Sequence, residues 1–114
     1  MTGFQNLNIE LDRVSKEIET TSYEVDIARE EYLIKKAEYE NKFAEVQLRA
    51  KAEDSESTQT DIKAMATRET YELRLEVITK DSACRKALNK LRALRDRLEA
   101  MREVSFNLRR ESKI

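Results

Sequence analysis

Proline is absent from this chain of 114 residues, and glycine occurs only once, at Gly3. Tight turns and β-hairpins need glycine for positive φ and proline for corners, so their scarcity excludes most folds that contain sheets. Histidine is also absent and Cys84 is the only cysteine, so no internal disulfide can form. No signal peptide is recognisable, and no uncharged apolar run approaches the ~18 residues of a membrane span. We therefore expect a cytoplasmic protein.

Charged residues make up 39 % of the chain and aromatic residues 6 %, a composition typical of long helices and coiled coils. Apolar side chains recur at every seventh residue in two stretches, and such a repeat predicts a helix that buries one narrow seam. The first stretch contains Phe4, Leu11, Ile18, Val25, Tyr32, Tyr39 and Val46. The second, read backwards, contains Leu108, Met101, Leu94, Ala87, Lys80, Leu73 and Ala66, of which only Lys80 is not apolar.

These two stretches are mirror images about residue 56, because each pair of residue numbers adds up to 112. The second half of each heptad follows the same rule and pairs Val14 with Leu98, Thr21 with Leu91 and Ala28 with Cys84. The mirror register predicts an all-α fold, a long antiparallel two-helix coiled-coil hairpin. Cys84 is then a small buried side chain in the seam and not a nucleophile, since no imidazole is present to activate it.

The hairpin accounts for the whole chain as one domain, with helix one at about 4–52, a turn at about 53–60 and helix two at about 61–110. The turn is the stretch without large apolar residues. Ser57 or Thr58 is expected to cap helix two, since Thr58 and Asp61 resemble a capping box. A single continuous helix is the alternative, in which the mirror register would be accidental.

Near the turn, Lys35, Lys42 and Arg49 occupy seam positions, while apolar residues lie on the outer faces instead. One explanation is that a helix of 3.6 residues per turn drifts past a 3.5-residue repeat, so that the buried face rotates. The other is an interface between copies of the chain, since a contiguous exposed apolar patch is normally covered. We favour oligomerisation, through Ile27, Ile34, Leu48, Tyr71, Leu75 and Ile78.

Charge is unevenly distributed along the chain, although the net charge is only −1. Residues 1–60 carry 8 basic and 14 acidic side chains, whereas residues 84–114 carry 10 basic and 4 acidic ones. One edge of the hairpin explains part of this asymmetry, because the glutamates of helix one face Lys90 and Arg97 there. Those glutamates are Glu10, Glu17, Glu24, Glu31, Glu38 and Glu45.

The other edge of helix two carries arginines whose counterparts on helix one, Asn8, Ser15 and Ser22, are uncharged. Guanidinium groups in a row on a rigid helix suit phosphate or carboxylate groups. The alternatives are a solvated face or pairing with acids of a neighbouring subunit. Phe106 lies beside the row and is placed to stack on a base. The candidate nucleic-acid-binding residues are Arg92, Arg95, Arg102, Arg109 and Arg110.

Residues that carry catalysis are scarce. Without histidine, glycine-rich loops or a convergent pocket, none of the common acid–base, phosphate-cradling or triad arrangements can be assembled. Metal binding would rest on carboxylates alone, and no spacing of these suggests a cage. We expect neither an enzyme nor a cofactor, metal or small-molecule substrate.

The run CRKALNKLRALRDRLEAMREVSFNLR, from Cys84 to Arg109, resembles the C-terminal segment of small helical bacteriophage proteins encoded in recombination and replication gene clusters. The segment Tyr32–Tyr39 and the polar break before Ala64 resemble them too, so that the similarity loosely covers residues 25–110. The best understood proteins of this kind are the UvsY-like recombination mediators. The resemblance implies an oligomer in the host cytoplasm that binds single-stranded DNA and helps load a recombinase onto strands coated by single-strand-binding protein.

Two classes of function follow from these observations. The first is a non-enzymatic recombination or replication accessory protein that organises single-stranded DNA or its binding proteins. The second is a structural or protein-binding coiled-coil adaptor, including a phage inhibitor of a host protein, that binds no nucleic acid. They differ in whether the arginine row meets DNA.

Overall fold

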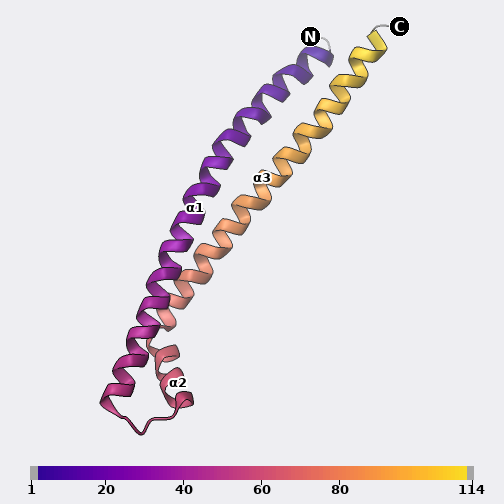
Figure 1. The fold of residues 1–114 in the computed structure, drawn as a ribbon. Coiled ribbons are helices and arrows are strands. Elements are labelled where there is room, and N and C mark those ends of the chain that lie inside the picture. The colour runs from indigo at the N-terminus through magenta and orange to yellow at the C-terminus, as the bar shows by residue number, and fades with distance from the viewer. Residues whose placement is uncertain (1–2, 113–114) are drawn as a thin grey trace. The chain divides into compact units, whose positions relative to one another are not determined.

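The computed structural model describes residues 3–112, and in this range the chain is all-α. It contains α1 (Gly3–Glu53), α2 (Gln59–Glu69) and α3 (Tyr71–Ser112). The chain divides into two compact units, residues 1–27 with 85–114 and residues 28–84. In each unit α1 packs antiparallel against a later helix, so the predicted all-α helical hairpin is confirmed (Figure 1).

In the first unit the seam follows the mirror register. Val14 is fully buried, Thr21 and Leu91 lie opposite each other and are both buried, and Val25 and Leu94 are buried as well. Their mirror partners Leu98, Ile18 and Ala87 are half-buried. This narrow stripe is what a seven-residue apolar repeat produces when it meets a single partner helix. The side chain of Phe4, at the predicted end of the seam, lies outside the described part.

The second unit is built around α2, which lies beside the C-terminal part of α1 (Figure 1). The mirror pairs Val46 with Ala66 and Ala50 with Ile62 are all buried. Arg49, which occupies a seam position in the heptad register, is instead exposed and forms an ion pair with Glu69 of α2. Near the turn the buried face has therefore moved by one residue, as expected when 3.6-residue geometry drifts past a 3.5-residue repeat.

Lysines replace apolar residues in the seam of the second unit, and their stems remain half-buried. The Nζ of Lys80 lies 3.0 Å from Glu31 Oε2, and the Nζ of Lys35 lies 3.2 Å from Glu38 Oε2 and 3.3 Å from Glu76 Oε2. The hydrogen bonds that the Lys35 ammonium donates to Glu38 and Glu76 raise the pKa of Lys35. Both lysines cover the seam with methylenes and place their charge at its edge.

The turn between α1 and α2 spans Asp54–Thr58 and uses no left-handed residue, and no residue of the described range, Gly3 included, has positive φ. Asp54 Oδ1 accepts a hydrogen bond from the Glu56 backbone N–H at 3.0 Å, and its carbonyl accepts one from Ser57 N–H at 3.1 Å. Thr58 caps α2, as predicted, because its hydroxyl oxygen accepts from Asp61 N–H at 3.2 Å. Side chains thus replace the glycine that such turns usually need.

The predicted single helix over residues 61–110 requires correction, because the structure divides it into α2 and α3 at Thr70. The Thr70 hydroxyl donates to the Ala66 carbonyl at 2.6 Å, and the Thr70 N–H donates to the same oxygen at 3.1 Å. Threonines that bond back to the preceding turn bend helices. The carbonyl of Thr70 accepts from Arg74 N–H at 2.9 Å, so α3 begins at once.

Candidate nucleic-acid interface

The five arginines predicted to bind nucleic acid all lie on the C-terminal half of α3, in the first unit, and all are exposed. Arg92, Arg95 and Arg102 have no hydrogen bond or ion pair from their side chains to any other described residue. Arg109 does interact with another residue and Arg110 follows it at the end of the row. The structure therefore presents at least three guanidinium groups that no carboxylate of the described chain neutralises.

Cations on the opposite edge of α3 have acidic partners on α1. Lys90 Nζ lies 3.6 Å from Glu24 Oε2, and Arg97 Nη2 lies 3.3 Å from Glu10 Oε2, which confirms the predicted pairing along this edge. Glu17, the third glutamate of this edge, is bound by Arg13 Nη1 at 2.5 Å. Carboxylates of α1 therefore neutralise the cations on one edge of α3, whereas at least three arginines on the other edge have no such partner among the described residues.

Glu10 is the most heavily engaged carboxylate of the paired edge. Arg13 Nη2 lies 2.7 Å from Glu10 Oε2, on the same oxygen that Arg97 approaches. The hydrogen bond from Arg13, helped by the positive charges of Arg13 and Arg97, lowers the pKa of Glu10 below its ordinary value of 4.5. Glu10 therefore binds a cation of its own helix, Arg13, and a cation of α3, Arg97, and both favour its ionised form.

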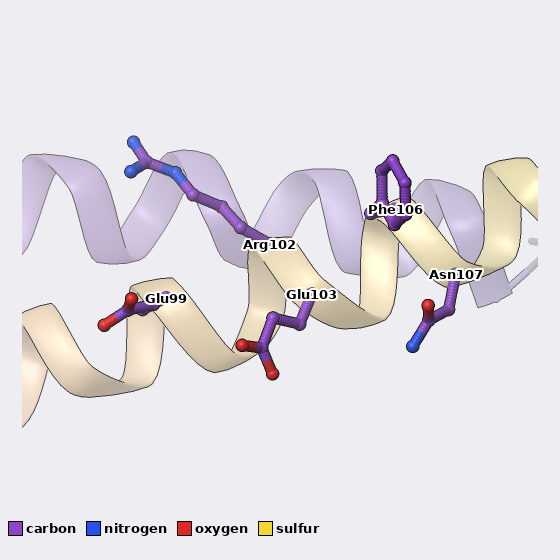
Figure 2. Close-up of a pocket in the computed structure, with 5 residues that line it drawn as sticks. All are labelled: Glu99, Arg102, Glu103, Phe106 and Asn107. Atoms are coloured by element: carbon purple, nitrogen blue, oxygen red, sulfur yellow. The ribbon is translucent and has the colours of Figure 1, made fainter.

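A shallow depression on α3 has an arginine and an aromatic ring in its lining. It is lined by Glu99, Arg102, Glu103, Phe106 and Asn107 (Figure 2). Arg102 and Phe106 project to one side of the helix, whereas Glu99, Glu103 and Asn107 project to the other (Figure 2). Phe106 is 64 % exposed, an unusual state for a phenylalanine on a helix that has an apolar seam. A cation and an exposed ring on one side suit a phosphate and the base attached to it.

The six residues predicted to form an oligomer interface are all exposed, as an interface residue must be in an isolated chain. Ile27 lies in the first unit, and the other five lie in the second. Ile34 and Leu48 are 51 % and 73 % exposed, and Ile78 is 54 % exposed. The sequence pattern did not single out five further exposed apolar residues, Ile9, Tyr23, Leu33, Met65 and Val104. Their exposure could have been predicted from the sequence, because none of them occupies a seam position of the mirror register.

Cys84 is buried in the second unit with a free thiol, as predicted. Within residues 3–112 no three side chains of the metal-ligating types gather into a possible ion site, and no helix in this range is long and apolar enough to cross a membrane. Comparison of the chain with protein-family models, with curated proteins and with solved structures finds no match. The exposed side chains of the hairpin are therefore the evidence for its function.

Proposed function

We propose that this protein is a non-enzymatic accessory factor of recombination or replication that binds single-stranded DNA through the arginine row of α3. The observation that carries the proposal is that Arg92, Arg95 and Arg102 are exposed and lack acidic partners in the described chain, although α1 neutralises Lys90 and Arg97. Three guanidinium groups without acidic partners, spaced along one helix, match the repeating negative charge of a phosphate backbone. The likeness to UvsY-like phage mediators points in the same direction.

The mechanism is organisation of a strand and involves no bond chemistry. Arginines spaced along one helix contact successive phosphates without reading base edges, so binding is independent of sequence. Phe106 adds stacking on a neighbouring base, which every base permits because each has a π-face. As an oligomer in the cytoplasm, the protein would hold a strand for a partner such as a recombinase or a single-strand-binding protein.

Fluorescence anisotropy of a labelled oligonucleotide, measured at several salt concentrations, tests this proposal. Four phosphate contacts per chain give a slope of log affinity against log salt of about −3, since each contact on a single strand contributes about −0.7. Affinity should be similar for oligonucleotides of different sequence. Absence of binding at low salt would refute the proposal.

The second candidate is a protein-binding adaptor that contacts no nucleic acid. The apolar side chains on the outside of the second unit favour it, among them Leu48, which is 73 % exposed. In this case the arginine row serves only solubility. The same anisotropy experiment separates the two candidates, because the adaptor shows no salt-dependent binding of oligonucleotides.

A further inference from the structure

The second unit carries two apolar stripes that its own seam leaves exposed. The outer stripe of α1 consists of Ile34, Ala37, Asn41, Ala44 and Leu48, and the outer stripe of α3 consists of Tyr71, Leu75, Ile78 and Ser82. All nine residues are exposed. In both stripes the members are separated alternately by three and four residues, which is the spacing of a second heptad seam. The spacing therefore predicts that each of the two helices contacts a further helix that is not part of its own hairpin.

The two stripes differ in shape in a complementary way. The outer stripe of α1 has large side chains at its ends and the small Ala37 and Ala44 near its middle. The outer stripe of α3 has large side chains, Leu75 and Ile78, at its middle. Close packing favours large residues opposite small ones, so the stripe of α3 fits the stripe of α1 better than either stripe fits a copy of itself.

Charge beside the stripes is complementary as well. Glu30 and Glu40 lie beside the outer stripe of α1. Arg74 lies beside the outer stripe of α3, which Arg68 at the end of α2 precedes in the sequence. All four side chains are exposed and none has an ion-pair partner among the described residues. Two copies joined through α1 stripes would bring glutamates together, and two joined through α3 stripes would bring arginines together. Only α1 against α3 pairs opposite charges.

We infer that the outer stripe of α1 in one copy of this chain binds the outer stripe of α3 in a second copy. Within the second unit the two stripes lie on the helix faces turned away from the shared seam, so the contact uses two different surfaces. After two copies have joined in this way, one α1 stripe and one α3 stripe remain free. Further copies can therefore add until a ring closes or a filament forms. Asn41, the polar member at the middle of its stripe, fixes the register of the contact. The inference specifies the self-association assumed in the proposed function and is independent of DNA binding.

Two variants that each destroy one stripe test this arrangement. Ile34→Glu with Leu48→Glu removes the stripe of α1, and Leu75→Glu with Ile78→Glu removes the stripe of α3. These positions are exposed and glutamate favours helix, so the hairpin should keep its helicity by circular dichroism. A control variant, Ile9→Glu with Tyr23→Glu, makes the same chemical change at exposed positions of the first unit.

Masses are measured by sedimentation equilibrium for each variant alone and for a 1:1 mixture of the two stripe variants. The wild type and the control should form assemblies larger than a dimer, and each stripe variant alone should be a monomer. The mixture should form a dimer and nothing larger, because one α1 stripe and one α3 stripe remain intact. A monomeric wild type, a stripe variant that dimerises alone, or a mixture that stays monomeric would each overturn the inference. Oligonucleotide binding is scored separately, so failure here is distinguishable from failure of DNA binding.

Discussion

A disulfide across the seam of the first unit tests the antiparallel pairing of α1 and α3 in solution. The change is Val14→Cys with Leu98→Cys, made in a Cys84→Ala background so that the native thiol cannot compete. Val14 is fully buried and Leu98, its mirror partner, is half-buried. A bond between the two positions closes a loop of about 85 residues, and the chain-entropy relation gives a stabilisation of about 4.5 kcal/mol for a loop of that length.

Loss of the valine and leucine side chains opposes this gain. Truncation of two seam residues costs about 2 kcal/mol in total, because one of them is only half-buried. The oxidised and reduced forms share this loss. The oxidised protein should therefore be more stable than its reduced form by about 4.5 kcal/mol and more stable than the wild type by about 2.5 kcal/mol, measured by urea denaturation with and without reductant. A non-reducing gel should show a monomer with a shifted mobility.

The matched control places the second cysteine at Asp96, an exposed position on the side of α3 away from the seam. It should form no bond within one chain. Disulfides that appear only between chains in the Val14–Leu98 variant would refute the hairpin within a single molecule. Equal yields for the variant and the control would show that the mirror register does not describe the seam.

Three further changes address the seam, the turn and the charged edge. Leu91→Ala, at a position only 5 % exposed, should lower the free energy of unfolding by about 2–3 kcal/mol in urea titrations, whereas Leu33→Ala, 53 % exposed, should change it by less than about 0.5 kcal/mol. Thr58→Ala removes the cap of α2 and should cost about 1 kcal/mol, while the exposed Thr60→Ala should cost far less. Glu10→Gln should lower the melting temperature at pH 7; because Arg13 depresses the pKa of Glu10 in the folded protein, this difference should be present above pH 4.5 and disappear as the pH falls through the folded value. A difference that persists at low pH would contradict that assignment.

Sequence predicted the seam of the first unit residue by residue, because heptads in mirror register leave one way to pair two helices. Near Arg49 it left two explanations open, and the structure shows that the buried face moves to Ala50, as helical drift predicts, while the exposed Arg49 forms an ion pair with Glu69. It did not predict the break at Thr70. At the break the Thr70 hydroxyl bonds back to the Ala66 carbonyl, but Thr20 and Thr79 make the same bond inside unbroken helices, so the presence of a threonine does not mark the position of the break.

The charged contacts on the surface were only partly predictable from the sequence. Patterning identified the exposed arginine row and the paired cations Lys90 and Arg97, because heptad positions assign each charge to an edge. It did not reveal that Arg13 binds Glu10 and Glu17, since both glutamates were expected to pair with cations of helix two. Rotamers and local competition for carboxylates decide such contacts, and the seven-residue repeat does not encode them.

The most direct test of the functional account compares the two edges of α3 by removing two positive charges from each. Arg95→Gln with Arg102→Gln takes them from the unpaired edge, and Lys90→Gln with Arg97→Gln takes them from the edge that Glu24 and Glu10 neutralise. Both variants have the same net charge, so any difference in binding reflects position. The measurement is the salt dependence of affinity for a labelled single-stranded oligonucleotide. The account predicts a slope shallower by about 1.4 for the unpaired-edge variant, at ~0.7 per lost contact, and little change for the paired-edge variant. Equal slopes for the two variants would contradict it.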